Sequence, residues 1–441
     1  MIVGENIKIS DINNNMNEDK IADLKAEVKK FTEKIKDEKL KTVFEKCFYN
    51  TIHTTTFYED DGSIFLITGD IPAMWLRDSS VQVMQYLYFA KECASVRKLI
   101  KGVLKKQFQF ILIDSYANAF NRTANGNGHV DDVDKQNPWV WERKFELDSL
   151  AYPLWLIYKY YTITKDASCF DELFLSAFDV IIKTFKTEQS HFEKSTYYHS
   201  NKINPECFAG RGTPVKNNGM IWSGYRPSDD KCKYGFYIPG NMFVVSVLEK
   251  MHAVFKDVLS DDERAKVSEK LADEVETAIK DNCTVVNSDG KRIYALETDG
   301  MGNYNVMDDA NIPNLIAMPY YEYPYIDKEI YANTREFMLS EKNPYYFVGK
   351  RLKGLGSPHT KEQYVWPLAL IIQALTSDDE KEINACIKML VNNTGNTGYM
   401  HESIHKDNDA LYSRAWFAWA NSLFSILILK ERNVIDGIDH I

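Results

Sequence analysis

The stretch Met242-Phe243-Val244-Val245-Ser246-Val247-Leu248 lies in a predicted helix over 239–257 and is hydrophobic on all sides. The next predicted helix, over 260–282, carries charged residues on most of its surface. A helix that is apolar all round must be covered on every side, whereas a charged helix faces water. The two segments therefore predict an inner helix that is backed by an outer one.

The same pairing recurs along the chain. Helical periodicity predicts six hairpins and a closing helix, over 19–35 and 37–53, 79–94 and 96–119, 144–163 and 167–187, 239–257 and 260–282, 309–321 and 327–341, 361–376 and 378–392, and 408–430. Six pairs with a buried inner member favour an all-α ring, an (α/α)6 toroid, over a solenoid with two free ends, and no repeat of fixed length is present.

No Pro-, Gly- or Ser-rich linker divides the chain, so we predict a single domain over 16–441 after an N-terminal extension of residues 1–15. Long loops alternate with the short turns, over 54–78, 120–143, 188–238, 283–308, 342–360 and 393–407. In a toroid these loops all open at the same end of the ring, and loops of this length inside a compact domain are usually functional. The sequence thus predicts a funnel-shaped active site at that end.

Composition narrows the classes of function. The 441 residues include 53 basic and 63 acidic side chains, for a net charge of −10, and the basic ones are scattered, so we expect no nucleic-acid partner. The seven cysteines are odd in number and form no CxxC pair, which indicates reduced thiols and a cytoplasmic location. Neither a signal peptide nor a run of 18 apolar residues is visible, so we expect no membrane association. The sequence leaves the oligomeric state open.

The first loop cluster is Gly69-Asp70-Ile71-Pro72-Ala73-Met74-Trp75-Leu76-Arg77-Asp78-Ser79-Ser80, between a predicted strand over 64–67 and a helix with Asp78 or Ser79 as N-cap. Trp75 beside Arg77 and Asp78 can hold a polyhydroxylated ring, at a helix end that offers free N–H donors. The alternative is a structural ion pair between Arg77 and Asp78, with Trp75 in the core.

Four further clusters lie on later loops. They are 137–148 with Glu142 and Arg143, 222–230 with Tyr225, Arg226, Asp229 and Asp230, 307–313 with Asp308 and Asp309, and 357–360 with His359, followed by Gln363 and Trp366. Adjacent carboxylates repel each other, and burial beside aromatic rings desolvates them, so Asp229 or Asp230 is a candidate general acid. Each cluster also has a capping or core explanation. Gathered at one end of a ring, they predict a pocket for a neutral, hydroxyl-rich ligand.

His401-Glu402-Ser403-Ile404-His405 matches the H-E-x-x-H pattern, in which two histidines bind zinc and the Glu polarises the metal-bound water. The flanking residues are rich in turn formers, which places the pentapeptide on a loop, whereas ligands at i and i+4 need a helix to face the same way. A zinc metallopeptidase remains an alternative function. A carbohydrate-binding or isomerase toroid without hydrolytic activity is another, because a fold does not fix its chemistry.

Five motifs together resemble those of glycoside hydrolase family 125, the exo-acting α-1,6-mannosidases: 69–79, 140–150, 224–230, 307–313 and 400–403. The resemblance extends from about Thr55 to Trp419. It implies an (α/α)6 barrel that needs no metal or other cofactor. It also implies an enzyme that removes non-reducing terminal α-1,6-linked mannose from an oligosaccharide or glycan, with inversion at the anomeric carbon.

The resemblance places the general acid at Asp229 and the general base at Glu402, which makes the H-E-x-x-H match a coincidence. We expect repulsion from Asp230 and desolvation to keep Asp229 protonated, and hydrogen bonds from His401 and His405 to keep Glu402 ionised. Arg77 and Asp78 are expected to grip hydroxyls of the terminal mannose. The residues expected to bind substrate are Trp75, Arg77, Asp78, Glu142, Arg143, Tyr225, Arg226, Asp309, His359, Gln363 and His401.

Overall fold

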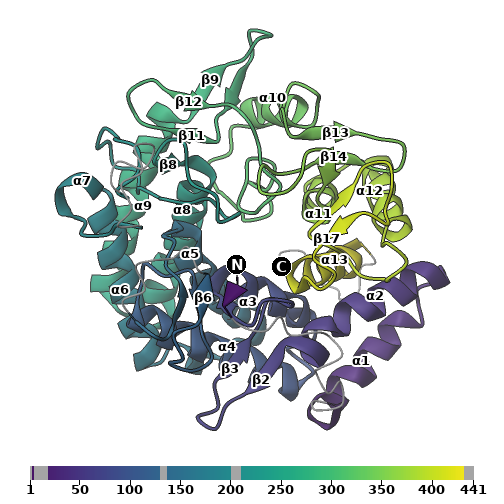
Figure 1. The fold of residues 1–441 in the computed structure, drawn as a ribbon. Coiled ribbons are helices and arrows are strands. Elements are labelled where there is room, and N and C mark those ends of the chain that lie inside the picture. Colours follow the sequence, from purple (N-terminus) through teal and green to yellow (C-terminus); the bar gives the residue numbers. More distant parts are fainter. Residues whose placement is uncertain (1, 4–17, 130–136, 200–209, 432–441) are drawn as a thin grey trace.

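The computed structural model describes residues 2–3, 18–129, 137–199 and 210–431, and Figure 1 shows their helices arranged as a ring. The helices are α1 Ala22–Thr32, α2 Glu38–Asn50, α3 Leu76–Met84, α4 Ala94–Ile113, α5 Leu147–Thr164, α6 Glu172–Glu188, α7 His191–Lys194, α8 Ile238–Ala253, α9 Asp262–Asn282, α10 Lys328–Met338, α11 Pro367–Leu375, α12 Glu380–Asn392 and α13 Ala418–Glu431. None of the helices in this described part of the chain has the length and apolar character needed to cross a membrane.

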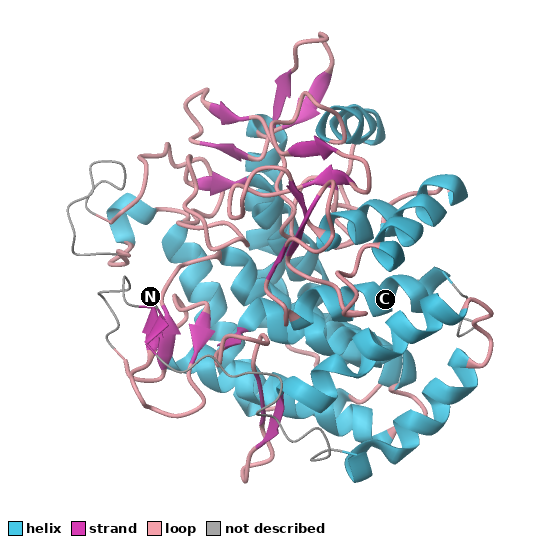
Figure 2. Cartoon of the chain, turned by 45° about the vertical axis from the view of Figure 1, so that its right-hand side comes forward, coloured by secondary structure: helices cyan, strands magenta, loops and turns pink. Residues whose placement is uncertain are grey.

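Short strands occupy the loops between these helices. They are β1 Ile2–Val3, β2 Thr56–Tyr58, β3 Ile64–Leu66, β4 Met74–Trp75, β5 Ala119–Phe120, β6 Gly128–His129, β7 Val140–Glu142, β8 Phe236–Tyr237, β9 Thr284–Val286, β10 Arg292–Tyr294, β11 Glu297–Thr298, β12 Tyr304–Asn305, β13 Tyr346–Val348, β14 Lys353–Leu355, β15 Tyr364–Val365, β16 Ser403–His405 and β17 Tyr412–Ser413. The strand predicted over 64–67 is thus confirmed as β3. Figure 2 shows most of the strands and long loops to the upper left of the helices.

The inner wall of the ring consists largely of helices that are buried along their whole length. Every residue of α3 and α11 is buried, as is α13 from Ala418 to Leu429. α3 packs against α5, α5 against α8, α11 against α13, and α13 against α3, which closes the ring. The charged helix α9 packs on the outside of α8, as its sequence predicts. The predicted all-α (α/α)6 barrel is confirmed.

The ring closes through segments from opposite ends of the chain, because α13 packs against α2. The helix α2 has one buried face and serves as the outer partner of α13, while α1 contacts α4 on the outside. The predicted hairpin of 19–35 with 37–53 is therefore not one of the six pairs. The predicted closing helix over 408–430 instead supplies the inner member of the sixth pair.

The predicted helix over 309–321 is wrong, because this segment forms turns. Pro313 and Pro319 lack the N–H groups that a helix needs. The Asp308 carboxylate accepts a hydrogen bond from the Ile316 N–H at 3.1 Å, so a side chain takes the place of the helical carbonyl acceptor. Most of the segment is buried, and it fills the inner wall between α8 and α11 (Figure 1).

Strands lead directly into several inner helices and delay their starts. The predicted helices over 361–376 and 408–430 begin only at Pro367 and Ala418, because β15 and β17 precede them. The helix α3 begins earlier than predicted, with Trp75 at its N-cap position, so the predicted N-cap at Asp78 or Ser79 is wrong. Both residues lie in the first turn of α3, where the free N–H groups of the helix favour an acidic side chain.

Of the predicted N-terminal extension, residues 1–15, only β1 is described. It pairs with β6 in an antiparallel arrangement. The predicted boundary at residue 16 lies outside the described residues.

Candidate active site

Arg77, in the first turn of α3, is surrounded by carboxylates. Its Nη1 lies 2.6 Å from Glu146 Oε2 and 3.2 Å from Asp148 Oδ2, and its Nη2 lies 3.2 Å from Asp229 Oδ1. Its Nε lies 3.6 Å from Asp78 Oδ2. One cation cannot offset the desolvation of all the carboxylates around it. Burial therefore raises the pKa of Asp78 and of Asp148 to about 6, and that of Glu146 well above its usual range.

The fold explains why these groups meet. α3 and α5 pack side by side, and Asp78 lies in the first turn of α3, as Asp148 does in the first turn of α5. Glu146 occupies the N-cap position of α5. The loop that precedes α8 brings Asp229 to the same helix ends. The helix N-termini thus supply positive dipole ends to a cluster of carboxylates.

Asp229, the predicted general acid, has a backbone φ of +64° and a side chain that is 22% exposed. Asn118 Nδ2 donates to its Oδ1 at 3.3 Å, on the atom that Arg77 also contacts. Burial raises the pKa of Asp229, but the charges of Arg77 and Lys144 outweigh burial and hold this pKa below its usual range. Glu146 binds the other terminal nitrogen of the same guanidinium, so its carboxyl lies beside that of Asp229.

The expected repulsion between Asp229 and Asp230 is therefore not what governs the acid. Asp230 has its own partners: its Oδ1 lies 3.2 Å from His359 Nδ1, and its Oδ2 accepts from Ser228 Oγ at 3.0 Å. Burial lowers the pKa of His359, but the hydrogen bond and charge of Asp230 outweigh burial and raise it to about 9. His359 is therefore a cation at neutral pH.

Glu402, the predicted general base, is fixed by the antiparallel pair β16 and β17. Ser403 pairs with Ser413, and Ser413 Oγ donates to Glu402 Oε2 at 2.8 Å. Arg414 Nη1 lies 3.7 Å from Glu402 Oε1. Arg414 is itself held by Asp70, whose Oδ1 accepts from Nε at 2.8 Å. The base thus has a firm hydrogen bond on one oxygen and a more distant cation on the other.

The hydrogen bonds expected from His401 and His405 to Glu402 are not made within the described residues. The His401 ring stacks on Tyr412 with 3.7 Å between centroids, and its Nδ1 contacts the Arg414 carbonyl at 3.1 Å. His405 Nδ1 accepts from the Asp407 N–H at 3.2 Å. His401 therefore supports the loop from inside the protein. In the described part of the chain no cluster of three or more His, Cys, Asp or Glu side chains has metal-binding geometry.

Charged side chains of alternating sign follow one another at this end of the barrel, and we call them the charge ring: Arg77, Asp229, His359, Glu402, Arg414 and Asp78. Each member perturbs the pKa of a neighbour, from Arg77 on Asp229 to Arg414 on Asp78. Alternating donors and acceptors suit a neutral ligand with many hydroxyls. The ring therefore fits a sugar better than it fits an ion.

Residues 37–429 match the sequence family of metal-independent α-mannosidases, glycoside hydrolase family 125. This chain belongs to that family. A protein of Schizosaccharomyces pombe, the meiotically up-regulated gene 157 protein, is 37% identical over 423 residues, which are 90% of this chain and 83% of that protein. The comparisons support neither the zinc metallopeptidase nor the non-hydrolytic alternative.

Solved structures give the same family and the same fold. A Streptococcus pneumoniae metal-independent α-mannosidase, in a non-productive complex with α-1,6-mannobiose, is 41% identical with a TM-score of 0.90, covering 93% of this chain and 99% of that one. The family 78 rhamnosidase of Bacillus sp. GL1 is 11% identical with a TM-score of 0.53, covering 89% of this chain and 35% of that one. The second likeness concerns the fold alone.

Three of the residues predicted to bind substrate lie close behind the charge ring in this family 125 member. Arg226 is buried with Nε 3.6 Å from Glu297 and Nη1 3.8 Å from Asp309. Glu142 accepts from Asn118 Nδ2 at 2.7 Å. Arg226 and Asp309 thus anchor the loop that carries Asp229, and the Asn118 amide that donates to Glu142 also donates to Asp229.

Four other residues that were predicted to bind substrate have their main contacts outside the charge ring. Trp75 packs in a small apolar cluster with Trp141, and Tyr225 is buried against the His199 ring at 4.8 Å. Gln363 is exposed, with a φ of +69°. Arg143 turns away from the charge ring, because its Nε binds Asp114 at 2.6 Å and its guanidinium lies over two tyrosine rings.

Sequence reasoning missed five polar residues at the site: Asn118, Glu146, Asp148, Ser413 and Arg414. Two of these, Glu146 and Asp148, belong to the motif over 137–148 and begin a buried helix, which is a usable signal. Ser413 and Arg414 fall in a segment that was predicted to be helical, so their approach to Glu402 could not be seen.

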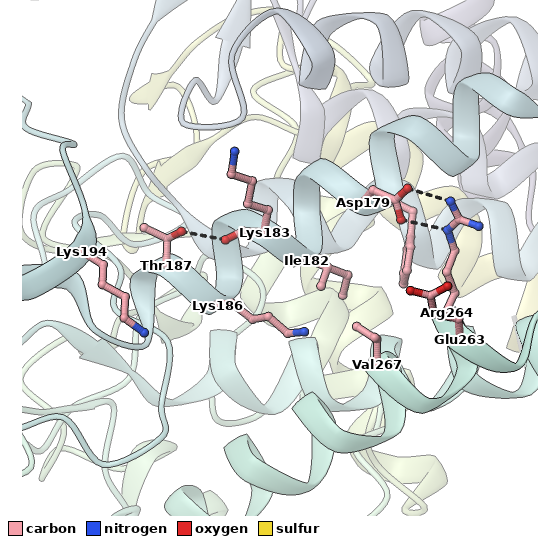
Figure 3. A pocket seen from close by; sticks show the side chains of 10 residues that line it. Asp179, Ile182, Lys183, Lys186, Thr187, Lys194, Glu263, Arg264 and Val267 are labelled. Atoms are coloured by element: carbon pink, nitrogen blue, oxygen red, sulfur yellow. Dashed lines mark hydrogen bonds and ion pairs between the residues drawn. The ribbon is translucent and has the colours of Figure 1, made fainter.

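A groove of about 550 Å³ lies elsewhere, on the outer wall between α6 and α9 (Figure 3). Exposed lysines line it, and Arg264 at its edge is already bound by Asp179, with 2.7 Å between Nη2 and Oδ2. The groove contains no member of the charge ring.

Proposed function

We propose that this family 125 member is an exo-acting, inverting α-mannosidase that hydrolyses non-reducing terminal α-1,6-linked mannose. The charge ring carries this proposal, because it presents two carboxylates, Asp229 and Glu402, with the His359 cation electrostatically coupled to both. The solved Streptococcus pneumoniae relative is a complex with α-1,6-mannobiose, which supports the same linkage here.

In this proposal Asp229 is the general acid. Its carboxyl protonates the glycosidic oxygen while the bond between that oxygen and the anomeric carbon breaks. Asp229 is the member of the Arg77 cluster with the most exposed side chain, 22% against 6% for Asp78 and 0% for Glu146 and Asp148. It is therefore the carboxyl of that cluster that a leaving group can reach.

Glu402 acts as the general base. Ser413 holds Oε2, so Oε1 is the oxygen that can take a proton from water. That water attacks the anomeric carbon from the face opposite the leaving group, and its oxygen forms the new bond as Glu402 takes the proton. The hydroxyl of the product consequently has the β configuration.

The terminal mannose is held by the remaining charges. Asp78 and Arg414 are the acceptor and donor that lie between Arg77 and Glu402 in the charge ring, and we propose that they bind sugar hydroxyls. Arg77 is 2% exposed, so it acts on the sugar chiefly by fixing the carboxylates around it.

We also propose a cytoplasmic location. The six described cysteines are free thiols, and five of them are buried. A protein that folds in an oxidising compartment more often carries disulfides.

Proton NMR during digestion of α-1,6-mannobiose tests the function. β-Mannose should appear first and then mutarotate, and the α-1,2- and α-1,3-linked disaccharides should be cleaved far more slowly. Asp229→Asn and Glu402→Gln should each abolish cleavage of the α-1,6 disaccharide while circular dichroism stays unchanged. Initial release of α-mannose would contradict inversion, and an intact disaccharide would contradict hydrolysis.

A further inference from the structure

Glu146 lies in the wall behind the proposed acid, and it has no part in the two proton transfers proposed for Asp229 and Glu402. We propose that Glu146 is a positioning residue that shares one proton with Asp229 and supplies the proton that Asp229 gives to the leaving group. This proposal rests on the proposed role of Asp229 as the acid.

The guanidinium of Arg77 sets the two carboxylates side by side. Its Nη1 binds Glu146 at 2.6 Å and its Nη2 binds Asp229 at 3.2 Å, and these two nitrogens belong to one rigid planar fork. Glu146 Oε2 also accepts from Ser149 Oγ at 3.2 Å. Both carboxyls are thus fixed in position before any substrate arrives.

The second oxygen of Glu146 shows where a proton belongs. Glu146 Oε1 is buried and accepts no hydrogen bond from any described residue. A buried carboxylate oxygen without a donor is costly, whereas a protonated one can donate to the neighbouring Asp229 carboxylate. A proton between Glu146 and Asp229 therefore satisfies both side chains.

The carboxyl groups around Arg77 outnumber its single positive charge, which favours a proton shared among them. The charged and titratable groups that face Glu146 are Arg77 from α3, Asp148 from α5, and Asp229 and Cys232 from the loop before α8. Asp78 joins the same cluster through Arg77, and Lys144 and His359 act on Asp229. Burial raises the pKa of Glu146 well above its usual range despite the Arg77 charge, and the neighbouring carboxylates add to the rise, which favours a proton on Glu146.

The step can be written so that protons balance. At rest Glu146 carries the shared proton and Asp229 is ionised against Arg77. When a glycosidic oxygen approaches, the proton moves to Asp229, Glu146 becomes the carboxylate against Arg77, and Asp229 then gives the proton to the leaving oxygen. Glu402 releases to solvent the proton that it took from the attacking water, and the pair recovers one proton from solvent through Asp229, whose side chain is 22% exposed, whereas that of Glu146 is fully buried.

Two substrates separate this role from a structural one. α-1,6-Mannobiose has a poor leaving group that must be protonated, whereas 2,4-dinitrophenyl α-mannoside has a leaving group that departs without an acid. Glu146→Gln keeps the shape of the protonated side chain, but its amide donates permanently to Asp229 and cannot give up a proton. Asp148→Asn is the matched control, because Asp148 binds the same Nη1 of Arg77 without a hydrogen bond to Asp229.

For Glu146→Gln we expect kcat on mannobiose to fall about 10- to 100-fold, a part of the 10²- to 10⁴-fold that a general acid contributes, with little change in KM. kcat on the dinitrophenyl substrate should stay within about threefold. Because a permanent amide donor favours ionised Asp229, the high-pH limb of kcat/KM on mannobiose should move to lower pH. Asp148→Asn should change kcat on the two substrates by similar factors. It should leave the high-pH limb of kcat/KM where it is in the wild type.

The proposal would be overturned if Glu146→Gln lowered kcat on the two substrates by the same factor. It would also be overturned if kcat on both substrates equalled that of the wild type. Infrared difference spectra of wild type against Glu146→Gln provide a readout that does not need activity. A protonated-carboxyl band at neutral pH that disappears in Glu146→Gln and persists in Asp148→Asn supports the shared proton, and its absence from wild type refutes it. Asp229→Asn tests the underlying function separately. If that variant lowered kcat on both substrates by the same factor, Asp229 would not be the acid.

Discussion

Replacing Arg77 by Met would test whether the charge ring depends on this one cation. Met fills much of the same space without charge, and it leaves Glu146, Asp148 and Asp229 without the nitrogens that lie within 3.2 Å of them. Removing one partner of a buried ion pair costs about 3–5 kcal/mol. We therefore expect Arg77→Met to lower the free energy of unfolding by about that amount at neutral pH.

The loss should depend on pH in a defined direction. Without Arg77 the buried carboxyls have folded-state pKa values raised further above those of the unfolded chain than in the wild type, so the folded variant binds more protons than the folded wild type. Stability then falls as pH rises, by about 1.4 kcal/mol per pH unit for each extra proton bound. For one proton, the deficit should grow by about 3 kcal/mol between pH 6 and pH 8.

Urea unfolding followed by tryptophan fluorescence at these two pH values measures the effect, with equal m-values required for the comparison. Arg143→Met is the matched control. It removes an arginine from an ion pair with Asp114 outside the charge ring, so it should cost about 1–2 kcal/mol at both pH values. The reasoning would be refuted if Arg77→Met lowered the free energy of unfolding equally at pH 6 and pH 8. It would also be refuted if Arg143→Met showed the same dependence on pH.

Three further changes have defined outcomes. Ser413→Ala removes the hydrogen bond that holds Oε2 of the Glu402 carboxylate, so kcat/KM on α-1,6-mannobiose should fall about 10- to 100-fold, and the loss of this bond, worth about 1.5–3 kcal/mol, should also lower Tm. Gly69→Ala places a Cβ 2.2 Å from the Trp416 carbonyl oxygen at a φ of +132° and should lower stability by at least about 2 kcal/mol, measured by urea midpoint. Gly62→Ala, at a φ of +80° with nothing within 4 Å, should cost only about 1 kcal/mol and serves as its control. Dialysis against a chelator should leave kcat unchanged, as the metal-independent family requires, and a loss restored by added metal would contradict this.

The inner wall could be predicted from sequence because burial on all sides leaves a plain signal. The apolar run over 242–248 marks α8, and the charged helix α9 marks the outside of the ring. The prediction failed over 309–321, where the sequence is also largely apolar. There the Asp308 carboxylate and two prolines replace helical hydrogen bonds, which periodicity does not record. The pairing of α2 with α13 was also hidden, because it joins the two ends of the chain.

Motifs in the sequence indicate which loops form the candidate site. Contacts between residues that lie far apart in the sequence leave no such local pattern. The loops that carry Asp229 and Glu402 were identified, but the partners of these two residues were not. Arg77 reaches Asp229 across 152 positions, and Ser413 reaches Glu402 across a strand pair within a predicted helix. Pairings of this kind follow from the closure of the barrel rather than from local sequence.

The sequence of the stretch 69–80 allows either a site that binds a sugar ring or a structural ion pair. Arg77 is 2% exposed and meets three carboxylates within 3.2 Å, so its charge is engaged before any ligand arrives. A cation engaged in this way still acts on catalysis, because it decides which carboxyls keep their protons. Under our proposals the two interpretations describe one arrangement: Arg77 sets the protonation of Glu146 and Asp229, and we expect Asp78, whose pKa burial raises to about 6, to bind the substrate.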